Sequence, residues 1–404
     1  MEVFIARQPI FDAKQALYGY ELLYRSSGEN FFTEVDGDEA SLSVIRNVLL
    51  VIGAEKISGG RKAFVNFTKN LLLSGAASFL PKEIGVVEIL EDVGPDAELI
   101  KTLKSLRSQN YTLALDDFIL RGNENHPFLN LVDIIKVDFR QTDELERAAI
   151  AERFPPQGKV KLLAEKTETQ EEFRQALEMG YSFFQGYFFC KPVVMARRDI
   201  PAYKMNCLGI LKELNTESPN YTSIQKHIGQ DASLAYKLLK YINSAFFGLR
   251  REVASIRQAL ELLGEYEIRK WASIAVIMEL GKGHPKELIR LSLLRARLFE
   301  KLAVAFGFHD QKAEFFLMGL LSFLDVLLER PMEEILEDVP LAATSKAALL
   351  GEPNSYRDVF DLVVSYERAE WTLMPELAFR LGIGQWEMSL LYSQSVEWVD
   401  AALQ

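Results

Sequence analysis

Cysteine and histidine are scarce in this chain. Two cysteines, Cys190 and Cys207, and four histidines stand among 404 residues. A disulfide framework needs more cysteines than this, and a zinc site needs cysteine and histidine ligands at close spacing, which the sequence does not offer. Neither a disulfide scaffold nor zinc chemistry is therefore expected, and Cys190 is most simply interpreted as an apolar strand residue.

The chain also lacks an excess of basic residues and lacks long hydrophobic runs. Its net charge is −11, with 57 acidic and 46 basic side chains, whereas a protein that binds nucleic-acid polymers generally needs a basic field. This balance still allows a small anionic ligand in a local pocket with its own metal. Charges interrupt the most apolar stretches too often for a bilayer span, and the first residues lack the form of a signal peptide. We therefore expect a cytoplasmic protein that binds neither nucleic-acid polymers nor membranes.

The first half contains short apolar runs that each end in a polar side chain. They lie at 64–67, 86–90, 113–118, 134–139, 162–167 and 183–188. Their spacing of roughly 20–30 residues fits one strand, one helix and two loops, which predicts a parallel sheet. In a closed parallel barrel the carboxyl ends of all strands meet at one face, where active sites lie. We therefore predict a TIM-barrel-like α/β domain over residues 1–195. The polar endpoints expected to converge in it are Asn66, Glu88, Asp116, Asp117, Lys136, Asp138, Glu165 and Gln185.

Beyond about residue 200 the pattern changes from strands to helices. Apolar residues three and four apart dominate the segments 286–306, 312–329, 355–370 and 385–402, which is typical of amphipathic helices. Another helix is expected to begin at the cap Ser255 and to end at Gly264. The second half, 200–404, is therefore predicted to be an all-α domain, joined to the first through residues 193–205.

The polar endpoints also indicate a kind of chemistry. Hard oxygen ligands suit Mg²⁺, Mn²⁺ or Ca²⁺. Near the N-terminus, Glu21 and Arg25 stand four residues apart, and the planar fork of an arginine can donate two parallel hydrogen bonds to a phosphate. Metal ions that activate water, an arginine that holds a phosphate and a carboxylate that accepts a proton together fit metal-assisted hydrolysis of a phosphodiester.

The same residues resemble the EAL domain family, phosphodiesterases of the bacterial second messenger cyclic di-GMP. The family motif E-A-L-x-R corresponds to residues 21–25, and the motifs N, E-x-x-E, D-D-F-G, K-x-D, A-E-G-V-E and Q-G-Y follow in order at 66, 88–91, 116–118, 136–138, 164–168 and 185–187. The resemblance implies cyclic di-GMP as ligand and Mg²⁺ or Mn²⁺ as cofactor. It also implies roles for individual residues: Glu21, Asn66, Glu88 and Asp116 as metal ligands; Glu165, Lys136 and Asp117 as catalytic groups; and Arg25, Gln185 and Asp138 as ligand-binding groups.

Three positions depart from the family pattern. Leu22 stands in place of alanine, Ile119 in place of the glycine after D-D-F, and Lys166 in place of the glycine after Glu165. Any positive φ needed at Ile119 would be disfavoured, and Lys166 adds a charge near the metals. Since sites weaken when their supporting residues change, we expect cyclic di-GMP binding with slow or lost hydrolysis. An active phosphodiesterase and a non-binding adaptor are the alternatives.

The second half, 200–404, resembles the HDOD domain, a helical relative of HD phosphohydrolases, and the most specific part of the resemblance is 231–272. The HD enzymes hold metal with a His-Asp pair, but Ser322 and Phe323 stand at the corresponding place here, and they cannot replace two metal ligands. A His-Asp pair does occur at His309-Asp310, where Asp310 is more simply interpreted as a helix cap. The resemblance therefore implies an interaction module without chemistry of its own, which contacts a signalling partner; a homodimer is left open.

Overall fold

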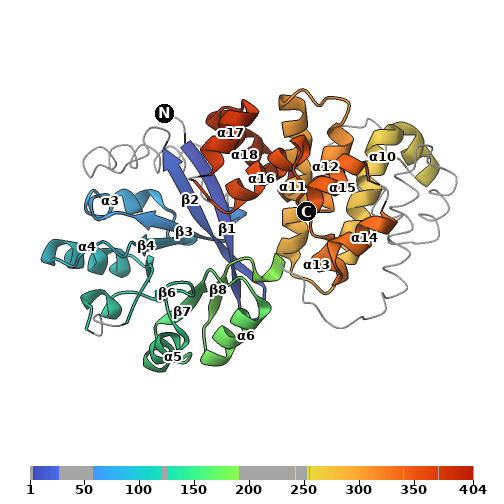
Figure 1. The fold of residues 1–404 in the computed structure, drawn as a ribbon. Coiled ribbons are helices and arrows are strands. Elements are labelled where there is room, and N and C mark those ends of the chain that lie inside the picture. Colours follow the sequence, from blue (N-terminus) through green and yellow to red (C-terminus); the bar gives the residue numbers. More distant parts are fainter. Residues whose placement is uncertain are drawn as a thin grey trace.

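The first half of the chain forms a closed eight-stranded barrel in the computed structural model, which describes residues 3–26, 58–120, 125–190, 242, 253, 255–339, 341–371 and 373–403. Neighbouring strands follow chain order around the barrel (Figure 1). The strands are β1 (Val3–Asp12), β2 (Leu17–Ser26), β3 (Lys62–Phe67), β4 (Gly85–Ile89), β5 (Thr112–Leu115), β6 (Ile134–Asp138), β7 (Lys161–Glu165) and β8 (Phe183–Gln185). The predicted α/β barrel is confirmed.

Strand β1 has the opposite direction to its neighbours. It pairs antiparallel with both β2 and β8, whereas β2 to β8 pair in parallel. In the register of these pairs, Gln8 lies opposite Glu21 and Ile10 lies opposite Gln185. The parallel strands therefore bring their carboxyl ends to one mouth of the barrel, and β1 brings its amino-terminal half to the same mouth.

A layer of apolar side chains fills the barrel and explains why the polar endpoints converge. Its buried members are Ile10, Phe64, Val86, Ala114, Ile134 and Leu163. Side chains of a strand alternate between its two faces, so the residue two positions later points into the same interior, one step nearer the mouth. Along β3 to β7 those residues are Asn66, Glu88, Asp116, Lys136 and Glu165.

Helices cover the outside of the barrel. They are α3 (Lys69–Leu73), α4 (Ala97–Ser108), α5 (Glu144–Arg153) and α6 (Gln170–Met179). Helix α6 begins with a capping box, in which Thr169 Oγ1 accepts from the Glu172 backbone N–H and Glu172 Oε2 accepts from the Thr169 backbone N–H, each at 3.1 Å. This reciprocal cap satisfies two backbone donors that the first helical turn would leave without partners.

The described residues of the second half form helices joined by turns and short loops. Its longer helices are α10 (Ile256–Leu280), α11 (Lys286–Ala305), α12 (Lys312–Leu320), α16 (Ser355–Glu367) and α18 (Gln385–Ala402), and its shorter ones are α13 (Leu324–Leu328), α14 (Met332–Asp338), α15 (Ala343–Leu349) and α17 (Met374–Leu381). The predicted helix 312–329 is divided into α12 and α13. Ser255 caps α10 as expected, but Gly264 is a kink inside this helix rather than its end. The expected cap at Asp310 is wrong, because α12 begins after Gln311 without a side-chain cap.

The helical half packs against the barrel through strand β1. Helices α16 and α18 both contact β1, and Figure 1 shows these orange and red helices beside the blue strands β1 and β2. The segment 193–205, expected to join the two halves, lies outside the described residues. In the part of the chain that the structure describes, no helix combines the length and the apolar character that a membrane span requires.

Candidate metal centre

Lys136 lies at the centre of the barrel mouth, surrounded by carboxylates. Its side chain is 1% exposed, and its Nζ is 2.8 Å from Glu88 Oε1, 2.8 Å from Asp116 Oδ1 and 2.9 Å from Glu165 Oε1. Glu21 Oε1 lies farther away, at 3.7 Å. Acidic side chains from β2, β4, β7 and the end of β5 are therefore gathered within reach of one ammonium group.

Two amide side chains orient Glu21. Asn66 Nδ2 donates a hydrogen bond to Glu21 Oε1 at 3.2 Å, and Gln185 Nε2 donates one to Glu21 Oε2 at 2.6 Å. Asn66 lies on β3 and Gln185 on β8, the two strands that flank the β1–β2 pair. Both carboxylate oxygens of Glu21 are thus held inside the barrel. The structure brings Glu21, Asn66, Glu88, Asp116, Lys136, Glu165 and Gln185 together, as the sequence predicts.

Asp117 joins this cluster through an unusual backbone conformation. Its φ is 40°, in the left-handed region that aspartate tolerates better than most residues. Oxygen atoms of Asp116, Asp117 and Glu165 all lie within 4.8 Å of one another. The strain that we expected at Ile119 is absent, because the positive φ of this turn falls on Asp117. Residues 121–124 of the following loop lie outside the described residues.

Asp138 lies at the rim of the cluster and is held by a second lysine. Lys166 Nζ is 2.5 Å from Asp138 Oδ2, and the Arg140 backbone N–H donates to Asp138 Oδ1 at 2.6 Å. Burial alone would raise the pKa of Asp138, but these bonds hold that pKa below its ordinary value. Gln141 Nε2 bridges Asp138 Oδ2 at 3.1 Å and Asp117 Oδ2 at 3.2 Å. Lys166 itself has a φ of 52°, which a glycine would adopt without strain.

Burial controls the ionisation of the central groups. It raises the pKa of Glu88 and of Glu165 well above their ordinary values, although Lys136 acts in the opposite direction. Burial also opposes the charge on Lys136, but the carboxylates of Glu165, Glu21 and Glu88 outweigh it and raise the pKa of Lys136 well above its ordinary value. The charged form of Lys136 is therefore favoured, and the carboxyl groups around it outnumber it.

This surplus of acidic oxygens fits a divalent cation. Six carboxylates face two ammonium groups, those of Lys136 and Lys166. Among the described residues, the buried atoms Glu88 Oε2 and Gln185 Oε1 have no hydrogen-bond partner, and buried polar atoms without partners are costly. Oxygen donors of this kind suit Mg²⁺, Mn²⁺ or Ca²⁺. Which residues coordinate the ion stays a prediction, and the side chain of Arg25 lies outside the described part of β2.

Gln8 belongs to the site although the sequence pattern did not indicate it. Its Oε1 accepts a hydrogen bond from Gln185 Nε2 at 3.0 Å. Because β1 is antiparallel, its polar residue precedes the interior residue Ile10 by two positions instead of following it. The period-two alternation could have identified Gln8, but only with the direction of β1 known.

The helical half has its own buried ionic centre, which is balanced in charge. Arg295 donates to Glu367 Oε2 from Nε at 2.9 Å and from Nη2 at 2.7 Å, and it donates from Nη1 to Ser322 Oγ at 3.2 Å. Its guanidinium group lies 4.0 Å from the ring centre of Phe323. Ser322 and Phe323 therefore both contact Arg295. His309 is an exposed residue that precedes α12.

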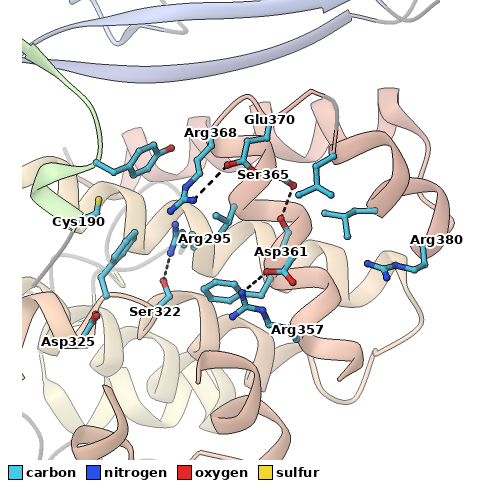
Figure 2. A pocket seen from close by; sticks show the side chains of 16 residues that line it. Cys190, Arg295, Ser322, Asp325, Arg357, Asp361, Ser365, Arg368, Glu370 and Arg380 are labelled. Atoms are coloured by element: carbon cyan, nitrogen blue, oxygen red, sulfur yellow. Dashed lines mark hydrogen bonds and ion pairs between the residues drawn. The ribbon is translucent and has the colours of Figure 1, made fainter. Parts of the chain in front are cut away.

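A pocket of about 490 Å³ opens beside Arg295, between the barrel and the helices (Figure 2). Tyr187 and Cys190 line it from the barrel side, so Cys190 is a pocket residue after β8 rather than a strand residue. The other arginines that line the pocket are also paired with carboxylates: Arg357 with Asp361 at 2.7 Å, Arg368 with Glu370 at 3.7 Å and Arg380 with Asp358 at 3.3 Å.

Comparison with known proteins places the chain in a family. Residues 58–192 match the EAL domain and residues 200–346 match the HDOD domain. The protein YuxH of Bacillus subtilis, described as uncharacterized, is 39% identical over 98% of this chain and 98% of its own length. A Vibrio cholerae protein named cyclic di-GMP phosphodiesterase CdgJ is 34% identical over 94% of this chain and 88% of its own length. The chain therefore belongs to the family of bacterial signalling proteins that join an EAL domain to an HDOD domain.

Solved structures with some similarity to this chain include proteins with an EAL domain. The Bacillus subtilis protein YkuI, with an EAL domain, was solved in complex with substrate c-di-GMP and calcium. It is 20% identical to this chain, covers 65% of this chain and 73% of its own, and has a TM-score of 0.40. At this level of similarity the side-chain geometry of the site comes from the present chain alone.

Proposed function

We propose that the barrel binds cyclic di-GMP at its carboxyl mouth together with Mg²⁺ or Mn²⁺, and that it hydrolyses one phosphodiester bond to give the linear dinucleotide. The observation that carries this proposal is the surplus of carboxylates around Lys136, with Asp117 turned toward Asp116 and Glu165. The 34% identity to a protein named cyclic di-GMP phosphodiesterase supports the choice of substrate.

The residues would divide the work as follows. Glu21, Asn66, Glu88 and Asp116 would hold the metal, with Asp117 at a second metal position. Bound metal ions supply an activated water and neutralise charge on the phosphate oxygens.

Glu165 would accept the proton of the attacking water, and Lys136, 2.9 Å from Glu165, would fix that carboxylate in place. Gln185, Asp138 and Arg25 would orient the nucleotide. Arg25 is assigned to the phosphate because a guanidinium group can donate two parallel hydrogen bonds to it.

Binding with slow or lost hydrolysis is the second candidate function. It is favoured by Lys166, whose ammonium group lies 2.5 Å from Asp138 Oδ2. This ion pair occupies a carboxylate that would otherwise be available to orient the nucleotide. The replacement of the family's glycine by Ile119 is a second departure from the family motif, beside Asp117. The position of Asp117 favours hydrolysis, because a second metal position requires this side chain to point inward.

The experiment is to incubate the purified full chain with cyclic di-GMP and Mn²⁺ and to measure binding and linear product in the same sample. Hydrolysis at about 1 s⁻¹ or more is an ordinary enzyme rate and supports the first candidate. Binding without product supports the second. A chain that neither binds nor hydrolyses the nucleotide is a non-binding adaptor, and both candidates are then wrong.

Matched variants connect the result to the site. Glu165→Gln should abolish product while nucleotide binding persists, because only the proton acceptor is removed. Glu152→Gln makes the same chemical change on the exposed face of α5 and should leave product formation unchanged. Equal loss of product in both variants would show that the activity does not depend on the barrel mouth.

A further inference from the structure

A continuous series of hydrogen bonds joins the helical half to the metal centre. Gln185 Nε2 donates to Glu21 Oε2 at 2.6 Å and to Gln8 Oε1 at 3.0 Å. Gln8 Nε2 in turn donates to the backbone carbonyl oxygen of Arg368 at 3.2 Å. Both amides donate through their nitrogen, and Gln8 accepts through its oxygen, as the chemistry of an amide requires. The two ends of the series, Glu21 Oε2 and the Arg368 carbonyl oxygen, are both acceptors.

The helical end of this series has a physical reason. Arg368 is the C-cap of α16, and the last carbonyl oxygens of a helix have no partner within the helix. Gln8 supplies a donor to one of them. The Arg368 side chain reaches back to the barrel as well, with its guanidinium group 5.2 Å from the ring centre of Tyr187.

A second contact fixes the helical half against β2. Tyr20 Oη donates to Glu287 at 3.0 Å from both carboxylate oxygens, and both side chains are buried. Burial raises the pKa of Tyr20 well above its ordinary value, so the hydroxyl group remains a donor. Glu287 lies in the first turn of α11, where the helix dipole favours a carboxylate. Tyr20 and Glu21 are neighbours on β2, so one faces the helices and the other faces the barrel interior.

We propose that the helical half positions the metal ligand Glu21 through the backbone carbonyl of Arg368, Gln8 and Gln185, while the contact between Tyr20 and Glu287 keeps that carbonyl in place. The helical half is then a built-in regulator of the barrel: movement of α16 changes the orientation of a ligand side chain. This role rests on the proposed function of the barrel as a metal site, and it assigns Gln8 and Tyr20 as positioning residues.

The test is a double-mutant cycle on Mn²⁺ affinity in the full chain without nucleotide, measured by electron paramagnetic resonance. Gln8→Met breaks the series, and Tyr20→Phe removes the hydroxyl that holds the helical half. Each should weaken Mn²⁺ binding by about tenfold, the lower end for changes in groups that orient metal ligands. The double variant should be no weaker than either single variant, because both changes act through the same route. A product of the two effects, about 100-fold, would mean independent routes and would overturn the proposal.

Tyr111→Phe is the matched control. Tyr111 is a buried tyrosine whose Oη donates to the Leu80 carbonyl at 3.0 Å, far from the helical half in sequence and within the barrel domain. Its loss should lower thermal stability as Tyr20→Phe does, yet leave Mn²⁺ affinity unchanged. An equal fall in Mn²⁺ affinity would show that the effect is general loosening of the barrel and would overturn the proposal.

A separate measurement distinguishes failure of this proposal from failure of the proposed function. If wild-type protein binds no Mn²⁺, the proposed function fails, and the proposal is decided by the side-chain amide signal of Gln185 in a ¹H–¹⁵N spectrum of metal-free protein. Gln8→Met and Tyr20→Phe should both shift that signal, and Tyr111→Phe should not. If the Gln185 amide signal keeps its chemical shift in Tyr20→Phe, the proposal is overturned.

Discussion

The barrel and the helical half each bury a cation among acidic side chains, but the two centres differ in balance. In the barrel, Lys136 is in contact with the carboxylates of Glu88, Asp116 and Glu165. Glu21 and Asp117 add two further carboxylates nearby. In the helical half, Arg295 faces Glu367 as a bidentate pair and fills its remaining bonds with Ser322. The first centre has more carboxyl groups than ammonium groups, which leaves oxygen atoms for a metal ion, whereas Arg295 and Glu367 in the second centre form a balanced pair.

This difference separates a centre that can accept a metal ion from one in which an arginine and a glutamate satisfy each other. At Ser322 and Phe323, where the resemblance to HD enzymes implies the place of a His-Asp pair, Arg295 donates to the Ser322 hydroxyl and lies over the Phe323 ring. An arginine with its own carboxylate replaces the need for a metal there. The barrel gathers several acids around one lysine, so only this centre has carboxylate oxygens to spare for a metal ion.

The largest expected effect concerns the structural centre. Arg295→Met leaves Glu367 buried without its partner, and breaking a buried pair in this way costs about 3–5 kcal/mol. The unfolding free energy of the full chain, measured by chemical denaturation, should fall by that amount. Replacing Glu367 by methionine as well should recover most of the loss, because the unpaired charge is removed. A double variant as unstable as the single one would show that the pair is not the source of the effect.

The next effect concerns the barrel centre. Mn²⁺ at 100 times its dissociation constant should stabilise the full chain by about 2.7 kcal/mol, since a ligand that binds only the folded state adds this much. Thermal unfolding with and without Mn²⁺ measures it. Glu88→Gln should remove the gain, whereas Arg295→Met should retain it on a lower baseline. A metal-dependent gain that survives Glu88→Gln would place the ion elsewhere.

The smallest effect concerns the backbone beside the metal centre. Lys166 has a φ of 52°, which costs an L-residue about 1 kcal/mol and costs glycine almost nothing. Lys166→Gly and Lys166→Ala both lose the ion pair with Asp138, so the difference between them isolates the backbone. Glycine should be more stable by about 1 kcal/mol in chemical denaturation. Equal stability would show that this conformation is not strained.

Much of the barrel could be predicted from the sequence because the alternation of side chains along a strand determines both the barrel interior and the residues at its mouth. Each apolar run fixes an interior residue, and period-two alternation then places a polar residue at the mouth, as with Val86 and Glu88 or Leu163 and Glu165. The helical segments were predictable for a similar reason, from their periods of three and four. Gln8 was not predicted, because on the antiparallel strand β1 the polar residue at the mouth precedes the interior residue Ile10 instead of following it.

Other features depend on tertiary contacts that no local pattern encodes. The contact between Tyr20 and Glu287 joins residues that are 267 positions apart, and each residue alone is compatible with an ordinary surface. Strain was expected at Ile119 because a glycine is replaced there, but the turn places it on Asp117. The segment 312–329 is divided into α12 and α13, and Arg295, from another helix, donates to Ser322 at the break between them.

The most direct test of the contrast between the two centres is the number of Mn²⁺ ions bound per full chain, measured by equilibrium dialysis with cyclic di-GMP present. We expect bound Mn²⁺ in wild-type protein, its loss in Asp116→Asn, and no change in His309→Ala, because the surplus acidic oxygens lie at the barrel mouth, whereas the His-Asp pair of the helical half begins at an exposed histidine. Mn²⁺ that persists in Asp116→Asn and disappears in His309→Ala would contradict the account.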